Sequence, residues 1–159
     1  LAIRPAADGV STDIFFGTLT NHAARGSYPA DLTDASVLSG TVAWYRYSES
    51  GGGGTLTQLA FRELLPTATD RGGFGVVGLA VGDLLDNPGE ELVVTTLAGD
   101  LFVFDLANNT ISTQPLYRTW VPGGLGLYNS IQIRDLDPFS IGPELYIASS
   151  LGLRKWKRT

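Results

Sequence analysis

Three similar segments follow one another along the chain, and this repetition restricts the possible folds more than any other feature of its 159 residues. Each copy opens with a short apolar run, at residues 1–4, 79–82 and 131–134. A second run, led by an acidic residue, follows a turn, at residues 13–18, 91–96 and 144–149. A third run begins at a glycine, at residues 40–45, 99–104 and 152–156. The repetition predicts a fold that is built by stacking equivalent units.

The repeated unit has the sequence pattern of a small antiparallel β-sheet. Its runs are rich in β-branched and aromatic residues, and the 20 glycines and 8 prolines of the chain punctuate them. No window shows the sustained apolar spacing of a helix. A fourth run is present in the first two copies, at residues 57–62 and 113–118. The copies recur at about 50 residues, which is the spacing expected of four-stranded propeller blades.

These boundaries predict an all-β chain, a β-propeller segment of about three four-stranded antiparallel blades. The blades cover about residues 1–71, 72–122 and 123–159, and the third blade lacks its last strand. The first blade carries an insertion at residues 20–39 and a glycine run at 51–54, which we expect to be flexible. Because an incomplete propeller leaves strands without neighbours, we expect the remaining blades to come from the same polypeptide or from another copy.

The second copy, over residues 74–105, resembles the FG-GAP and VCBS-type repeats found in integrin α-chain propellers and many bacterial surface proteins. The third copy is less similar and the first is degenerate. The resemblance implies a propeller with more blades than this chain supplies, in an extracellular or cell-surface protein. The chain also begins at Leu1 and contains no methionine, so we expect it to be a piece of a longer precursor.

Composition excludes several other classes of protein. The net charge of -5 argues against a nucleic-acid partner, because such proteins neutralise phosphates with a basic surface. The absence of cysteine excludes disulfides and thiolate metal sites. No apolar run reaches the roughly 18 residues of a spanning helix, so we predict no membrane span.

The resemblance also implies a calcium loop between the first two strands of a copy, with oxygen ligands at alternate positions. Leu85 and Phe139 occupy ligand positions in the second and third copies, so the loops are eroded. Two interpretations remain open: a weakened calcium site, or turns in which the acids accept backbone N–H groups. The candidate ligands are Asp83, Asn87, Glu91, Asp135 and Asp137.

The insertion in the first copy is the second candidate site, because loops on rigid scaffolds often carry function. It contains the only histidine and a mixture of side chains suited to polar recognition: His22, Arg25, Tyr28, Asp31 and Asp34. The alternative is a solvated loop that binds nothing. No motif fixes a serine or carboxylate near the histidine, so we predict no catalytic residues in this chain.

Aromatic residues recur at matching strand positions, which predicts packing between blades rather than sugar stacking. Glu90 and Glu91 are adjacent on a predicted strand, so they point to opposite faces and cannot act as an acid/base pair. Successive side chains of a strand point to opposite faces, so the four basic residues within 154–158 are likewise divided between two faces of the predicted strand.

The sequence therefore predicts a non-catalytic recognition or structural module of a secreted or cell-surface protein, which binds a protein or glycan partner through its loops. No cofactor is predicted apart from the calcium considered above. The alternative is a fragment of a propeller enzyme, either polysaccharide-active or cofactor-dependent, whose catalytic residues lie outside this chain. The fold alone does not decide between them, because propellers host many unrelated functions.

Overall fold

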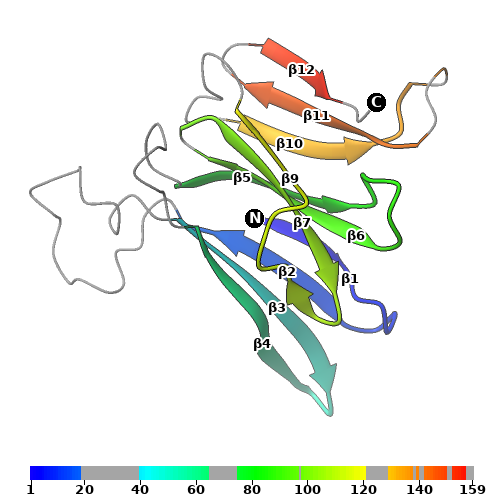
Figure 1. The fold of residues 1–159 in the computed structure, drawn as a ribbon. Coiled ribbons are helices and arrows are strands. Elements are labelled where there is room, and N and C mark those ends of the chain that lie inside the picture. The colour runs from blue at the N-terminus through cyan, green and yellow to red at the C-terminus, as the bar shows by residue number, and fades with distance from the viewer. Residues whose placement is uncertain are drawn as a thin grey trace, which may run out of the picture.

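A computed structural model describes residues 1–18, 40–64, 75–96, 98–120, 129–137, 139, 142–149 and 152–156. All regular elements of this part are β-strands, and they form three antiparallel sheets (Figure 1). Sheet 1 consists of β1 (Ala2–Pro5), β2 (Thr12–Gly17), β3 (Gly40–Ser50) and β4 (Gly53–Leu64). Sheet 2 consists of β5 (Val76–Gly82), β6 (Glu90–Thr96), β7 (Asp100–Ala107), β8 (Thr110–Ile111) and β9 (Tyr117–Trp120). Sheet 3 consists of β10 (Asn129–Arg134), β11 (Glu144–Ser149) and β12 (Gly152–Trp156).

The all-β prediction is confirmed, and every strand predicted in the three copies overlaps a strand of the structure. Neighbouring strands within each sheet are consecutive in the chain, apart from β9, which pairs with β7 beyond the short β8. β8 and β9 thus share the place of one fourth strand. None of the sheets closes on itself, and their assignment as propeller blades stays a prediction. No helix long and apolar enough to cross a membrane occurs in the part of the chain that the structure describes.

The glycine run at 51–54 lies in the β3–β4 hairpin, and its expected flexibility stays a prediction. Gly51 and Gly52 form the tight turn of the β3–β4 hairpin, with φ of 61° and 86°. Two consecutive residues with positive φ match the twist of antiparallel strands, and glycine adopts this conformation without strain. Gly53 and Gly54 belong to β4 and pair with Ser50 and Glu49. The run is therefore a hairpin.

The three copies are equivalent in register. Ile14, Leu92 and Leu145 each lie on the second strand of their sheet, and each forms a row with its neighbours on the first and third strands. These rows are Ile3–Ile14–Tyr45, Val81–Leu92–Phe104 and Ile133–Leu145–Trp156. The repetition seen in the sequence is thus a repetition of strand pairing.

Each sheet has two faces, because successive side chains of a strand point to opposite sides. We call the face that carries Ile14, Leu92 or Leu145 the N-side face, and the opposite one the C-side face. The C-side face of sheet 1 packs on the N-side face of sheet 2 in one apolar core, which includes Phe15, Trp44, Leu92 and Phe104. The C-side face of sheet 2 packs on the N-side face of sheet 3 in a second core. Sheet 2 is therefore the middle layer of the stack in Figure 1.

Some of the aromatic residues pack between sheets, as predicted, and others do not. Phe15 and Trp44 stack with ring centroids 5.1 Å apart in the first core, and Tyr117 of β9 meets Trp156 of β12 at the same distance. Phe16 also stacks on Tyr45, at 5.3 Å, but this pair lies on the N-side face of sheet 1. No described sheet covers that face.

Two glycines allow neighbouring sheets to approach closely. A Cβ on Gly17 of β2 would lie 2.6 Å from Cβ of Val76, and the backbone N–H of Val76 donates to the carbonyl of Thr18. A Cβ on Gly82 of β5 would lie 3.3 Å from the side chain of Ile133 in β10. The spacing of the stack therefore depends on the absence of a side chain at these positions.

Candidate functional site

The acid that leads the second strand of each copy is completely buried. Asp13, Glu91 and Glu144 have no exposed surface, and all three belong to C-side faces at the end of the sheets where the β1–β2, β5–β6 and β10–β11 loops lie. A carboxylate is very unfavourable away from water unless it is paired or hydrogen-bonded. The partners of these acids therefore indicate their role.

Glu91 holds the β5–β6 loop in place. Its Oε2 accepts hydrogen bonds from the backbone N–H groups of Leu84, at 2.7 Å, and Leu85, at 3.1 Å. Its Oε1 is buried and has no hydrogen-bond partner among the described residues. Glu144 repeats this arrangement, since its Oε2 accepts the backbone N–H of Leu136 at 3.4 Å and the hydroxyl of Tyr146 at 3.5 Å. In both copies the acid fastens the loop that precedes it.

Asp13 has different partners. Its Oδ1 accepts from Nε of Arg46 at 2.8 Å, and its Oδ2 accepts from Nη2 of Arg46 at 3.2 Å and of Arg4 at 3.4 Å. The hydrogen bonds that Arg46 donates to Asp13 raise the pKa of Arg46, whereas burial lowers the pKa of the Arg4 guanidinium. Arg4 also pairs with Glu90 of β6, so this cluster links sheet 1 to sheet 2. The β1–β2 loop must be held by another residue.

That residue is Asp8. Its Oδ1 accepts the backbone N–H groups of Val10 and Ser11 at 3.0 and 2.8 Å. The hydrogen bonds from Ser11 and Val10 favour the charged carboxylate and lower its pKa to about 2. The first copy therefore fastens its loop with an exposed acid within the loop, while the buried acid of its second strand is held by two arginines.

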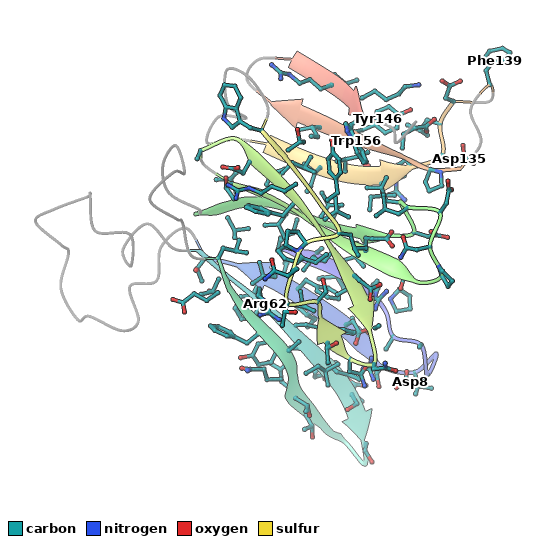
Figure 2. The ribbon with its side chains drawn as sticks, viewed as in Figure 1. Asp8, Arg62, Asp135, Phe139, Tyr146 and Trp156 are labelled. Carbon is teal, nitrogen blue, oxygen red and sulfur yellow. The ribbon has the colours of Figure 1, made fainter. Side chains whose placement is uncertain are left out.

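The β10–β11 loop carries two of the predicted calcium ligands. Asp137 accepts the backbone N–H of Phe139 at 3.0 Å and lies 2.6 Å from Nζ of Lys155, whose pKa is raised by this hydrogen bond. Asp135 is exposed. Phe139 extends from the loop into solvent and is 97% exposed (Figure 2). Asp137 thus serves a turn and an ion pair.

These contacts bear on the two interpretations of the predicted ligands. In the β5–β6 loop, Oε2 of Glu91 receives two N–H donors, which would repel a cation at the same oxygen, and Asp83 is exposed. The described residues contain no group of three or more His, Asp or Glu side chains placed to hold a metal. The geometry favours the turn interpretation for Glu91 and Asp137. Calcium binding by the five candidate residues stays a prediction.

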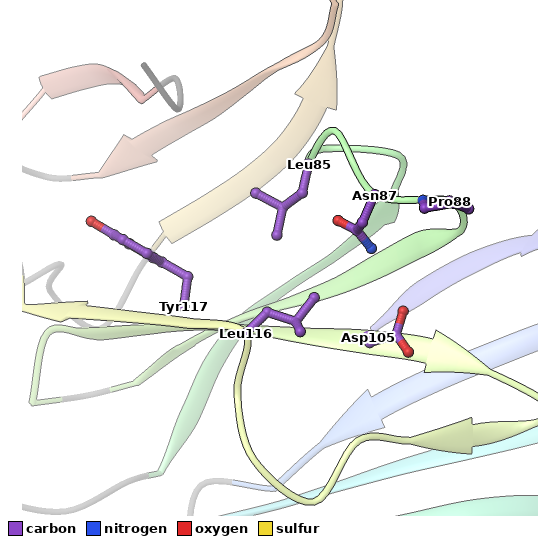
Figure 3. A pocket seen from close by; sticks show the side chains of 6 residues that line it. All are labelled: Leu85, Asn87, Pro88, Asp105, Leu116 and Tyr117. Carbon is purple, nitrogen blue, oxygen red and sulfur yellow. The ribbon is translucent and has the colours of Figure 1, made fainter.

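A pocket of about 460 Å³ opens between the β5–β6 loop and the strands β7 and β9 (Figure 3). In this view Leu85 and Asn87 point from the loop toward the segments that carry Asp105 and Leu116. Oδ1 of Asn87 is buried and accepts no hydrogen bond from a described residue. The pocket is lined by Leu85, Asn87, Pro88, Asp105, Leu116 and Tyr117. It combines apolar walls with two polar side chains.

Asp105 is the charged residue of this pocket. It lies on β7 directly opposite Glu91, so both carboxylates belong to the C-side face of sheet 2. The structure shows no hydrogen bond or ion pair of the Asp105 side chain with any described residue; its backbone N–H donates to Oγ of Ser112. The pocket therefore offers a negative charge and an amide oxygen to a ligand that brings hydrogen-bond donors.

Sequence reasoning identified only one of the residues that line the pocket, Asn87, and it assigned this residue to a metal. Asp105 and Tyr117 belong to different strands and share no motif with the loop, so their proximity is a result of tertiary packing. The predicted partner-binding residues His22, Arg25, Tyr28, Asp31 and Asp34 lie outside the described residues. The pair Glu90 and Glu91 does point to opposite faces, as predicted: Glu90 is exposed and Glu91 is buried.

A scan of the chain against models of protein families finds no match, and a search of curated proteins finds no matching relative. The resemblance to FG-GAP and VCBS-type repeats therefore stays a prediction. The site is defined by its geometry, which is a buried acid at the loop end of each sheet and an open pocket beside the acid of sheet 2.

Proposed function

We propose that this chain is a non-catalytic recognition module, built from propeller-type blades of the FG-GAP and VCBS kind, in an exported or cell-surface protein. It binds a protein or glycan partner at the end of the sheets where the β5–β6 loop lies. The observation that carries the proposal is the pocket beside this loop, where the buried Oδ1 of Asn87 and the carboxylate of Asp105 lack donors among the described residues.

The lining of the pocket supports a ligand of defined chemistry. Asp105 accepts hydrogen bonds only, and the amide oxygen of Asn87 is the atom left without a partner. Leu85, Leu116 and Tyr117 add apolar surface around them. A sugar presents hydroxyl donors beside an apolar C–H face, and a lysine or arginine side chain presents donors at the end of an apolar stem. Both fit the pocket.

The buried acids support binding rather than catalysis. Glu91 is engaged by two backbone amides, and Asp13 is engaged by two arginines. A general acid or base must be able to exchange its proton with a substrate, and these carboxylates fasten loops and sheets instead. Such anchoring gives a rigid scaffold, on which a pre-formed pocket binds with little loss of conformational entropy.

The proposal can be tested by NMR titration of the ¹⁵N-labelled chain with two sets of probes. One set consists of neutral oligosaccharides, and the other of blocked lysine and arginine amides. We expect saturable shifts of the amides of Leu85, Asn87 and Asp105 with one of the sets. Asn87→Ala and Asp105→Asn should remove them.

Asp86→Asn is the matched control, because Asp86 is an exposed acid of the same loop that does not line the pocket. This variant should retain the shifts. If neither set perturbs these amides, or if the shifts persist in both pocket variants, the pocket is not the binding site and the proposed function loses its support.

A further inference from the structure

The buried acid at the loop end of each sheet has direct neighbours on the adjacent strands, and these neighbours differ in charge between the sheets. In order of register, the rows are Arg4–Asp13–Arg46, Gly82–Glu91–Asp105 and Arg134–Glu144. In sheets 1 and 3 a cationic residue therefore lies directly opposite the buried acid. In sheet 2 the same positions hold a glycine and a second acid.

Asp105 occupies in sheet 2 the register position that Arg46 has in sheet 1. The Cβ atoms of directly opposite residues on antiparallel strands are about 4.5–5.5 Å apart, and like charges at such positions repel each other. Oε1 of Glu91 is buried, and neither it nor the carboxylate of Asp105 has a partner among the described residues. The described part of sheet 2 thus has no cation at the place where sheet 1 has two.

Arg46 shows which partners a guanidinium takes at this end of a sheet. Its Nε and Nη2 donate to the two carboxylate oxygens of Asp13 at 2.8 and 3.2 Å, and its Nη2 lies 3.4 Å from Oδ1 of Asn109. The pocket of sheet 2 offers the same two kinds of acceptor, the carboxylate of Asp105 and the buried Oδ1 of Asn87. A guanidinium carries its N–H donors in a planar fork that can reach both.

The shape of the pocket also fits an arginine side chain (Figure 3). Asn87 and Asp105 lie at one end, Leu85 and Leu116 lie on either side of the middle, and Tyr117 lies at the other end. An arginine side chain has this division, because its donors stand at the tip of an apolar stem. A sugar carries hydroxyl groups around its ring, so it matches the division less well.

We propose that the pocket binds the guanidinium group of an arginine side chain from a partner protein. This inference rests on the proposed function, because it names the ligand of the same pocket. The guanidinium donates to the carboxylate of Asp105 and to Oδ1 of Asn87, and the apolar stem lies between Leu85 and Leu116. The partner thus supplies to the row of Glu91 the positive charge that arginines supply in sheet 1.

NMR titration of the ¹⁵N-labelled chain with blocked arginine and blocked citrulline tests the proposal. In citrulline a neutral urea group replaces the guanidinium, so the two probes differ mainly in charge. We expect blocked arginine to shift the amides of Leu85, Asn87 and Asp105 saturably. Citrulline should bind with a Kd about tenfold higher, because charge-assisted hydrogen bonds are stronger than neutral ones. Added salt should weaken the binding of arginine.

Other outcomes of the titration separate this inference from the proposed function. Citrulline that binds as tightly as arginine overturns the inference, as does blocked lysine that binds as tightly. A saturable response to neutral oligosaccharides alone also overturns it, but leaves the proposed function standing. If none of these probes shifts the three amides, both fail.

Asp105→Arg tests the comparison of the rows directly. It gives sheet 2 the residue type that sheet 1 has at this register position, and the new side chain can donate to Oε1 of Glu91. This variant should melt at a higher temperature than Asp105→Asn and should not bind blocked arginine. Asp86→Arg makes the same change at an exposed loop acid outside the pocket, and should still bind it. An Asp105→Arg variant that melts below Asp105→Asn, or that still binds arginine at the pocket amides, overturns the proposal.

Discussion

Sheets 1 and 2 have the same strand order and register but differ in their surroundings. In sheet 2 both faces are covered, and the row Val81–Leu92–Phe104 is part of a core. In sheet 1 the equivalent row, Ile3–Ile14–Tyr45, lies on an exposed face. The two sheets also use their buried acids differently, since Glu91 binds the backbone amides of a loop and Asp13 binds two arginines. Strand pairing is thus a property of each copy, whereas burial is determined by its neighbours.

Truncation at equivalent positions should show the largest difference between the two sheets. Leu92→Ala removes a fully buried side chain, and we expect a loss of about 2–5 kcal/mol in the free energy of unfolding. Ile14→Ala removes a side chain that is only half-buried, so its loss should be roughly half as large. Both losses are measured by urea denaturation of the single variants. Equal losses would contradict the exposed N-side face.

Replacing the buried acids by alanine should give the next largest loss in the free energy of unfolding. Glu91→Ala leaves the N–H groups of Leu84 and Leu85 buried without an acceptor, and we expect a loss of about 3 kcal/mol. Asp13→Ala should cost about 2 kcal/mol, because the side chains of Arg4 and Arg46 keep partial access to water.

Hydrogen exchange distinguishes the two roles of these acids. In Glu91→Ala the amides of Leu84 and Leu85 should lose their protection, while in Asp13→Ala the amides of the β1–β2 loop should keep theirs, since Asp8 holds that loop. Loss of protection in both variants would mean that the two acids have the same role.

A substitution at the close contact between sheets 1 and 2 should change the free energy of unfolding by a smaller amount. Gly17→Ala places a Cβ against Val76, and we expect this overpacking to cost about 1–3 kcal/mol. Val76→Ala removes two obstructing methyl groups but keeps the Cβ, so it relieves part of the overlap and the double variant should be less unstable than the sum of the two single losses. Additive losses in a double-mutant cycle would indicate that the two residues do not meet.

The exposed acid of the first loop predicts a pH effect. The pKa of Asp8 is lowered from 3.8 to about 2 in the folded chain, so its stabilising contribution is present above about pH 4 and is lost as the pH falls toward 2. Asp8→Asn cannot ionise, and its stability relative to wild type should improve over this interval. Thermal unfolding of both proteins between pH 5 and pH 2 measures the difference, and parallel curves would contradict the prediction.

Calcium should have the smallest effect. Because Glu91 holds the backbone amides of its loop and Asp137 holds the amide of Phe139 and Lys155, we expect millimolar calcium or a chelator to leave the melting temperature unchanged. A midpoint that rises with calcium would instead support the loop residues as ligands. Asp83→Asn and Asp135→Asn would then identify which copy binds it.

The sequence was sufficient to predict the strands. The repeat length, the turn-forming residues and the alternation of apolar and polar side chains can all be read from residues that are close together in the chain. The turn between β7 and β8 is an example of a local signal, because Asn108 and Asn109 both have positive φ there, a conformation that asparagine adopts more readily than most residues. The pocket could not be predicted, since Asn87, Asp105 and Tyr117 meet only after the sheet has formed. The partners of the buried acids were also inaccessible, because an acid at the same position binds amides in one copy and arginines in another.

The order of the strands has a consequence for how the chain folds. Each sheet is assembled from segments that are adjacent in the chain, so hairpins can form early with little loop-closure cost. During synthesis the sheets would emerge in the order in which they stack, and each finished sheet would provide a template for the next. The slow steps are then the docking events between sheets, where Gly17 and Gly82 must meet Val76 and Ile133.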